Sequence, residues 1–570
     1  MEHKNLENVS STTLMLPKEG SEKVVMITPH SNGLGKVLIR EDTVLANLQG
    51  CAGCGKARFT CAGVKNQWSV LCWGRQSDKK YYTLLVLLSA TFVLSMIGTV
   101  FFCFTNTIND AILSNMVIRN NSLAYKVWQR PNVQPLMKVH VFNYTNWRAV
   151  RDGYEDTFHV EDTGPYVYSQ QVERVNVGFR GQQLTFQEIN DFRFLPNRSR
   201  GPHFDQVTVP NMPLLGLSKV VEGNFNPLAQ IPVLTMLPFA NHPEAFVQLP
   251  IHRFLWGYED SIFNAAKPLL SIRGELKVNQ FGLLAAKNQT LSERLTINTG
   301  VEDMDRMNVI EEVEGESQLN MWSGADCNSI EATDGSIFPP SQLDRKQVLY
   351  VFYPNLCRRL PFHYEMDVEL DGIPLLRYRL PNNVFDDPLH NKDNQCYCEV
   401  DSATCPPKGV INITACTMGA PALASFPHFS HGDPSLQHLI TGLHPERNYE
   451  NYLDIHPTLG IALRGKSSLQ INLQVRKSPS FTALSFLPQG LILPIAWIEM
   501  AVEELPESLR TLIYHGTYST AAAQLGLAVV SIASLIVSGL CLFMLLVGRR
   551  PKPCATVKIP IETEMKSPEP

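Results

Sequence analysis

The chain has 570 residues, a formal net charge of −5, 44% hydrophobic residues and 18% charged residues. This composition excludes an intrinsically disordered chain, and the acidic balance argues against a nucleic-acid-binding protein. The sequence contains no Walker, Rossmann, HExxH or GxSxG signature, so we expect neither an enzyme nor a bound cofactor.

Residues 1–82 form a polar N-terminal tail that contains four cysteines: Cys51, Cys54, Cys61 and Cys72. A Cys-x2-Cys pair followed by two further cysteines is one way to bind zinc, but the later spacings match no common zinc site. Reversible palmitoylation is the alternative for Cys72, and also for Cys554 near the other end of the chain. The sequence assigns the tail no further role.

Two segments, 83–104 and 525–547, contain no charged residue. As a helix the first would span about 33 Å, which matches the hydrocarbon thickness of a bilayer. A buried core helix seldom contains so long an uncharged run, and the first segment starts too far along the chain to be a cleaved signal. We therefore predict two transmembrane helices.

Basic residues lie just before the first segment and just after the second. They are Arg75, Lys79 and Lys80 before the first, and Arg549, Arg550 and Lys552 after the second. The positive-inside rule then places both termini in the cytosol, with 548–570 as the C-terminal tail. The segment 105–524 is predicted to lie outside the cell or in a lumen.

Small polar residues recur at helical spacing within the two predicted spans: Thr91, Ser95 and Thr99 in the first, and Ser534 and Ser538 in the second. Such strips let helices approach closely and form hydrogen bonds within a bilayer. The two helices are therefore expected either to pack against each other or to pair with another copy in a homo-oligomer.

The segment 105–524 is predicted to consist mainly of strands. Apolar and polar residues alternate over 138–142, 376–380 and 469–476, as in half-buried antiparallel strands. The stretch 211–258 differs, because it is more apolar and is interrupted by proline, so we expect short helices there.

Six cysteines lie close together in this segment: Cys327, Cys357, Cys396, Cys398, Cys405 and Cys416. Thiolates could hold a metal there, but an even number of cysteines in an oxidising compartment favours three disulfides. Five Asn-x-Ser/Thr sequons fall in the same segment and fit passage through the secretory route. They begin at Asn120, Asn143, Asn197, Asn288 and Asn412.

Seven stretches of the chain resemble the class B scavenger receptors, and they occur in the order found in that family. They are GPYVY (164–168), LWGYED (255–260), CNSIEATDGSIFPP (327–340), CYC (396–398), SFPHF (425–429), GLHPERNYENYLDIHPTLGI (442–461) and LPIAWIE (493–499). Members of that family include fatty acid translocase, the high-density-lipoprotein scavenger receptor, the lysosomal integral membrane protein and the insect sensory neuron membrane proteins.

The resemblance implies an α+β membrane protein: a large antiparallel β-barrel ectodomain with an apical helical bundle and an internal tunnel, anchored by two transmembrane helices. It also implies which cysteines pair, a choice that spacing alone leaves open among 15 connectivities. The implied pairs are Cys327 with Cys396, Cys357 with Cys416, and Cys398 with Cys405.

The function implied by the resemblance is that of a plasma-membrane receptor for lipids or lipoprotein particles. It would bind them at the apex and pass a fatty acid, sterol or carotenoid through the tunnel to the membrane. Candidate apical ligand residues are Lys219, Leu237, Phe239, His242 and Phe246. Relatives that capture anionic particles carry lysines where this chain has Ala240 and His242, so neutral or small lipids are favoured.

Two alternatives share this topology. The first is an endosomal or lysosomal receptor that carries a partner protein, although the C-terminal tail has no acidic dileucine signal. The second is a two-span channel, which would need polar pore-lining faces, whereas neither span contains a charged residue.

A histidine at the apex, His242, would also make ligand binding sensitive to endosomal pH if it faces the ligand.

Overall fold

The structure is a computed structural model that describes residues 38–40, 43–45, 78–222, 243–272, 277–398, 405–417, 419–477 and 481–548. The chain divides into two compact units: unit 1 comprises 1–99 and 530–570, and unit 2 comprises 100–529. The four tail cysteines, for which zinc binding was one alternative, and both candidate palmitoylation sites lie outside the described residues, as do the basic residues that flank the spans, except Lys79 and Lys80.

Two long helices contain the predicted spans: α1 (Asp78–Phe104) and α11 (Thr520–Val547). Both are long and apolar enough to cross a membrane, and only 6% of the most apolar window of each is buried inside the protein. A core helix would be mostly buried, so this exposure favours lipid as the surrounding medium. A short antiparallel pair, β1 (Leu38–Arg40) with β2 (Thr43–Leu45), precedes α1.

Part of the small-residue strips lies between α1 and α11, whereas Thr91 is exposed. Ser95 Oγ and Ser534 Oγ are 2.7 Å apart, and Ser538 Oγ donates to the Ser534 carbonyl. A Cβ at Gly98 would lie 2.8 Å from Ser531 Oγ, so the two helices approach closely at this point. Of the two arrangements that the sequence left open, this geometry matches packing within one chain.

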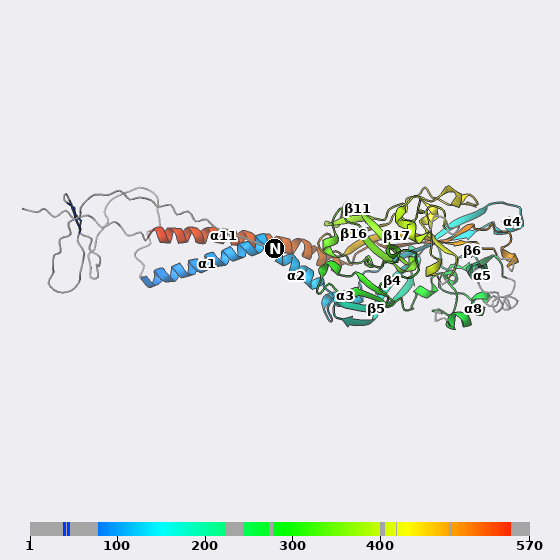
Figure 1. Cartoon of the computed structure of the whole chain (residues 1–570), viewed down its shortest axis with the longest axis horizontal. Coiled ribbons are helices and arrows are strands. Elements are labelled where there is room, and N and C mark those ends of the chain that lie inside the picture. The colour runs from blue at the N-terminus through cyan, green and yellow to red at the C-terminus, as the bar shows by residue number, and fades with distance from the viewer. Residues whose placement is uncertain are drawn as a thin grey trace, which may run out of the picture. The chain divides into compact units, whose positions relative to one another are not determined.

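Unit 2 contains a 14-stranded sheet, which confirms the predicted antiparallel β-structure (Figure 1). The hydrogen-bonded strands run in the order β10-β11-β12-β16-β17-β18-β3-β4-β5-β8-β9, with β14 on β17, β13 on β14, and β15 parallel to β4. Their bounds are β3 (Leu136–Tyr144), β4 (Phe158–Arg180), β5 (Gln183–Phe194), β8 (Leu295–Asn298), β9 (Ile310–Val313), β10 (Leu349–Tyr353), β11 (Arg358–Leu370), β12 (Ile373–Arg379), β13 (Val410–Asn412), β14 (Ala422–Ser425), β15 (Ile440–Thr441), β16 (Tyr452–Ile455), β17 (Ala462–Gln474) and β18 (Ile492–Val502).

The three strands predicted by alternation fall in β3, β12 and β17. β17 is longer than predicted at its N-terminal end and stops at Gln474, two residues before the predicted end. A register shift between Ile471 and Asn472 in its pairing with β18 marks a bulge near that end.

The stretch 211–258 contains the predicted short helices, α5 (Met212–Glu222) and α7 (Ile251–Trp256), and α8 (Ser261–Ile272) follows. The prediction is wrong for Phe246–Pro250, which forms strand β7 and pairs with β6 (Gln206–Pro210). Its alternating side chains fit a strand, and Pro250 ends it as the N-cap of α7. In Figure 1, α5 and α8 lie at the end of unit 2 opposite α2 (Thr107–Met116).

Among the described residues, the remaining α-helices of unit 2 are short: α3 (Leu123–Gln129), α4 (Trp147–Arg151), α9 (Ala325–Asn328) and α10 (Glu507–Tyr514). Phe246 lies in the main core, where its ring packs against Tyr144, Trp147 and Phe158. Its side chain is only 1% exposed. This burial corrects the expectation for Phe246, because so buried a ring cannot meet a ligand at the surface.

Candidate functional site

The central strands β3, β17 and β18 present two faces of different chemistry. Cross-strand partners share a face, so Gln470 with Trp497, and Ser468 with Glu499, lie on one side, which we call the polar face. Leu469 with Ile498, and Ser467 with Met500, lie on the other side, which we call the apolar face.

The polar face is the more buried of the two. Ser468, Gln470 and Asn472 are completely buried, whereas Leu469 and Ile471 on the apolar face remain partly exposed. The segment around SFPHF covers the polar face: the backbone N–H of His428 donates to Gln470 Oε1 at 2.6 Å. Alternation therefore predicts the strand but not which of its faces is buried.

A carboxylate, Asp162 on β4, ties the covering segment to the sheet. Asp162 Oδ1 lies 2.9 Å from His140 Nδ1, and Oδ2 lies 3.0 Å from His428 Nε2 and 3.1 Å from Trp497 Nε1. The ring of His140 also stacks on that of Trp497, with 3.8 Å between centroids. One carboxylate thus joins β3, β4, β18 and the 3-10 turn Pro427–Phe429.

The donors of this cluster can be assigned from their other contacts. His428 Nδ1 accepts the backbone N–H of His444 at 3.2 Å, so the ring proton of His428 must lie on Nε2. The indole N–H of Trp497 can only donate. Burial favours a higher pKa for Asp162, but the hydrogen bonds from His140 and His428 outweigh it and hold the pKa well below its ordinary value. The carboxylate therefore stays ionised at physiological pH.

Further along the polar face the charges pair with each other. Glu499 accepts from Lys138 at 3.0 Å and from Lys466 at 2.9 Å, and these contacts lower its pKa although burial raises it. The fully buried Asp454 accepts from Arg377 and Arg464, each at 2.7 Å. A cavity of about 250 Å³ lies beside Lys138, Lys466 and Glu499. Since these charges are mutually satisfied, the cavity offers no unpaired cation to a ligand.

The apolar face has the opposite character. Leu453, Leu469, Ile498 and Met500 pack against the main core but keep part of their surface accessible. Gly465 lies opposite Leu453 in the register, and a Cβ there would lie 2.9 Å from Leu453 Cδ2, so a larger residue would require the leucine side chain to shift. Accessible apolar side chains in the middle of a large sheet are unusual, since interiors normally pack without voids.

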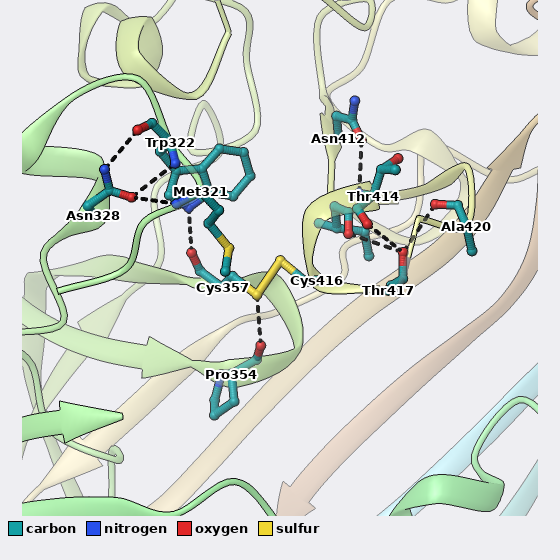
Figure 2. Close-up of a disulfide and its surroundings, with 11 residues drawn as sticks. Met321, Trp322, Asn328, Pro354, Cys357, Asn412, Thr414, Cys416, Thr417 and Ala420 are labelled. Atoms are coloured by element: carbon teal, nitrogen blue, oxygen red, sulfur yellow. Dashed lines mark hydrogen bonds between the residues drawn. A yellow bond between two sulfur atoms is a disulfide. The ribbon is translucent and has the colours of Figure 1, made fainter. Parts of the chain in front are cut away.

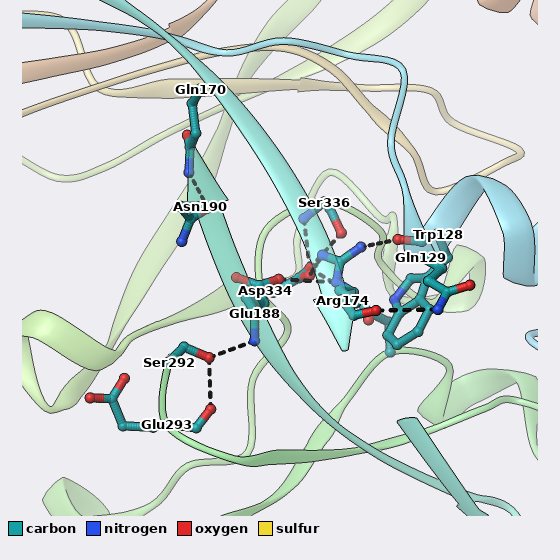
Figure 3. Close-up of polar contacts among 11 residues, drawn as sticks. Trp128, Gln129, Gln170, Arg174, Glu188, Asn190, Ser292, Glu293, Asp334 and Ser336 are labelled. Atoms are coloured by element: carbon teal, nitrogen blue, oxygen red, sulfur yellow. Dashed lines mark hydrogen bonds and ion pairs between the residues drawn. The ribbon is translucent and has the colours of Figure 1, made fainter. Parts of the chain in front are cut away.

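Another network of ion pairs is centred on a buried arginine of β4. Arg174 on β4 pairs with Glu188 at 3.0 Å and with Asp334 at 3.1 Å, and it also donates to the Trp128 carbonyl (Figure 3). Its guanidinium lies 4.8 Å from the centre of the Trp128 ring. Burial raises the pKa of Glu188 despite the contact with Arg174. This cluster fixes α3 and the 334 loop to the sheet, which is a structural role.

The structure contains the three disulfides that the resemblance implies: Cys327–Cys396, Cys357–Cys416 and Cys398–Cys405. Beside the disulfide Cys357–Cys416, the Trp322 indole N–H donates to the Cys357 carbonyl at 2.8 Å (Figure 2). The side chain of Asn328 accepts the backbone N–H of Trp322 and donates to its carbonyl. Among the described residues, no group of three or more His, Cys, Asp or Glu side chains could hold a metal ion.

The five sequon asparagines differ in accessibility. Asn120 and Asn197 are exposed, whereas Asn143, Asn288 and Asn412 are partly buried. The side-chain oxygens of the partly buried three each accept a backbone N–H, from Thr208, Phe192 and Thr414 respectively. Of the predicted apical residues, Lys219 is half-buried in the last turn of α5, and Leu237, Phe239 and His242 lie outside the described residues.

A buried histidine, His456, is expected to make unit 2 sensitive to acid; it lies within the stretch 442–461 that resembles the family, but nothing in the sequence indicates its burial. His456 Nε2 lies 2.8 Å from Thr517 Oγ1, and its Nδ1 accepts the backbone N–H groups of Thr458 and Leu459. Burial lowers its pKa to about 4 from an ordinary 6.5. Below pH 6.5 the unfolded chain binds this proton and the folded chain does not, so stability falls between pH 6.5 and pH 4.

At pH 5 this histidine should lower the free energy of unfolding by about 2 kcal/mol relative to pH 8. Replacement of His456 by glutamine should flatten that part of the pH profile, measured by denaturant unfolding of the purified chain. The same replacement at the exposed His438 serves as the control. Equal slopes for the wild type and the His456→Gln variant would contradict the assignment.

Comparison with known proteins agrees with these features. The CD36 family model matches residues 87–547. Lysosome membrane protein 2 from Mus musculus is 30% identical over 445 residues, which cover 76% of this chain and 88% of the relative. The human protein of that name is 28% identical with the same coverage. Scavenger receptor class B member 1 from Sus scrofa is 28% identical over 406 residues, covering 71% of this chain and 77% of the relative.

The family model covers most of the chain, and the Mus musculus relative is matched over most of its own length. The resemblance to the class B scavenger receptors is therefore confirmed, and so is a membrane protein with a β-rich unit and two spans. The chain belongs to the CD36 family.

Proposed function

We propose that this protein is a cell-surface scavenger receptor that binds lipids or lipoprotein particles and passes a lipid along the apolar face of unit 2 to the membrane. The observation that carries the proposal is the partial exposure of Leu453, Leu469, Ile498 and Met500 in the middle of the sheet. A packed core would bury these side chains, whereas the wall of an internal tunnel would leave them accessible.

An apolar wall suits a fatty acid, a sterol or a carotenoid. Each methylene removed from water gains about 0.8 kcal/mol, so a long acyl chain gains roughly 10 kcal/mol before entropic costs are counted. Such binding needs few directed polar contacts. The ionised groups of the polar face are paired with one another on the opposite side of the strands, so they do not interrupt this path.

The helices α5, α7 and α8 are the proposed site of ligand entry. Of these, α5 and α8 lie at the end of unit 2 opposite α2 (Figure 1). Lys219 is the cation of the proposed apical set that the structure describes, and it is half-buried. One half-buried lysine is a weak attractor for strongly anionic particles, which supports neutral or small lipids as cargo.

We further propose that both termini are cytosolic and that unit 2, approximately 105–524, is glycosylated on the outer side of the plasma membrane. Asn197 is the best acceptor of the five sequons, because its side chain is exposed; Asn120 is also exposed, but it comes just before α3, whose Leu123 and Val127 form an exposed apolar surface. A mass shift on glycosidase treatment of the full chain, lost only in part when Asn197 becomes glutamine, checks this orientation.

An intracellular receptor for a partner protein is the second candidate. The relative named lysosome membrane protein 2 supports it. Against it stands His456, whose burial costs folding stability at lysosomal pH. A two-span channel fits less well, because the predicted spans 83–104 and 525–547 carry no charged residue. No relative named above is called an enzyme, and we propose a non-catalytic role.

The proposal is tested with photoactivatable lipids on the purified, full-length chain. A diazirine fatty acid and a diazirine sterol are crosslinked separately, and the modified residues are mapped by mass spectrometry. We expect modification of the apolar face, at Leu469, Ile498 or Met500, and none at the buried polar residues Ser468 and Gln470 of the same strand. Crosslinks confined to the outer surface of unit 2 would overturn the tunnel and favour the partner-protein receptor.

A further inference from the structure

One end of unit 2 exposes a group of large apolar side chains. On α3, Leu123 is 70% exposed and Val127 is 42% exposed, and their spacing places both on one side of the helix. On α10, Leu512 is 59% exposed and Tyr514 is 48% exposed. Monomeric soluble proteins seldom leave such side chains grouped together without a partner.

The segments that carry these side chains are joined to one another by direct contacts. The backbone N–H of Ile118, just after α2, donates to the Thr299 carbonyl at 3.3 Å, and the N–H of Thr299 donates to the Gln182 carbonyl at 2.8 Å. The rings of Tyr125 on α3 and Phe179 on β4 are 5.6 Å apart. The tip of the β4–β5 hairpin and α3 therefore lie beside the C-terminal end of α2.

The helix α10 belongs to the same end. Ile513 on α10 is buried in a cluster that also contains Ile112 and Met116 of α2. Arg510 Nη1 lies 3.4 Å from Asp371 Oδ2, and the Tyr518 hydroxyl donates to the Gly372 carbonyl. The exposed apolar groups of α3, of the hairpin tip and of α10 thus surround one end of unit 2.

The connections of α2 and α10 to the two spans indicate what covers this end of unit 2. Only Thr105 and Asn106 separate α1 from α2, and α10 continues through the π-helix His515–Ser519 into α11. The end of unit 2 that contains α2 and α10 is therefore held next to the points at which the chain enters the bilayer. If the exposed apolar side chains at this end did not contact the bilayer, they would face water directly beside it, which is unfavourable.

We propose that this end of unit 2 docks on the lipid surface, with Leu123, Val127, Leu512 and Phe179 inserted at the boundary between head groups and acyl chains. The basic side chains nearby fit this position, because Arg119 and Lys126 are exposed and can reach the phosphates while their stems stay in apolar surroundings. Tyr514 and Tyr518 are placed as interfacial anchors. The proposal does not depend on lipid transport through unit 2.

The test uses the full chain in phosphatidylcholine nanodiscs that contain a phosphatidylcholine with a diazirine near the top of its acyl chain. After irradiation, peptides are mapped by mass spectrometry. We expect lipid on the peptides that contain Leu123 and Leu512. The internal control is Tyr154, which is 84% exposed, more than either, and whose backbone N–H donates to the Ala149 carbonyl of α4. That helix lies at the opposite end of unit 2 (Figure 1).

If exposure alone decided the labelling, Tyr154 would take as much lipid as Leu123, and that result would overturn the proposal. A double variant, Leu123→Glu with Val127→Glu, separates docking from folding. Both side chains are exposed, so the variant should keep its thermal unfolding midpoint and should lose most of the label on α3 and on the Phe179 peptide. Unchanged labelling in this variant would also contradict docking through α3.

Discussion

Replacement of Asp162 by alanine should lower the free energy of unfolding by about 3 to 5 kcal/mol, which is the usual cost of breaking a buried charge network. The reason lies in the three donors that converge on this carboxylate, from His140, His428 and Trp497. Without it, the buried N–H groups of His428 and Trp497 and the partly buried N–H of His140 lose their acceptor, and the segment around SFPHF loses its tie to the sheet. That is a large share of the free energy of unfolding of an ordinary domain, which is about 5 to 15 kcal/mol.

Replacement of Asp162 by asparagine should cost less, and the difference tests the proton assignment. His140 can move its ring proton to Nε2 and accept from the asparagine amide, whereas His428 and Trp497 must still donate. The asparagine therefore fits with its oxygen toward His428 and its amide toward His140. If asparagine proved as harmful as alanine, this assignment would be wrong.

Both variants are measured by denaturant unfolding of the purified chain and by the amount that reaches the cell surface. The matched control is Glu161→Ala on the same strand, because Glu161 is exposed and should cost little. A loss for Asp162→Ala no greater than that for Glu161→Ala would show that the cluster contributes little to folding.

The sequence predicts the large features of this protein because each has a local signal. An uncharged run predicts α1 and α11, alternation predicts β3 and β17, and cysteines in an oxidising segment predict disulfides. The disulfide pairing followed only from the resemblance, because spacing carries no information about which cysteines meet. The spans, the strands and the clustered cysteines are each indicated by a short stretch of chain, so their prediction does not depend on how the chain packs.

The sequence does not predict which face of a strand is covered. Alternation over 469–476 predicts a half-buried strand, yet its polar residues Gln470 and Asn472 are completely buried because a distant segment bonds to them. Phe246 was placed at the apex by its neighbours in the chain, yet tertiary packing buries it beside Tyr144. His456 lies in the family stretch 442–461, but its acid sensitivity follows only from its burial, which the sequence does not indicate.

Replacement of Ser467 by tryptophan should abolish lipid uptake and leave the amount of protein at the cell surface almost unchanged. Ser467 is partly exposed, lies on the apolar face opposite Met500, and has its hydroxyl 3.5 Å from that of Tyr353. A tryptophan there fills the space in front of Leu469 and Ile498 if that space is a tunnel. In a packed core the same change would cost about 1 to 3 kcal/mol of stability and would reduce surface expression.

Surface expression and uptake of a labelled fatty acid therefore distinguish a tunnel from a packed core, with uptake expressed per receptor at the surface. Ser467→Ala should behave as the wild type, Ser467→Phe should reduce uptake, and Ser467→Trp should bring it to the level of cells without the receptor. Ser485→Trp, at an exposed position, is the matched control and should transport normally. If uptake declined only in proportion to surface expression across this series, the apolar face would be part of the core, and lipid would have to reach the membrane by another route.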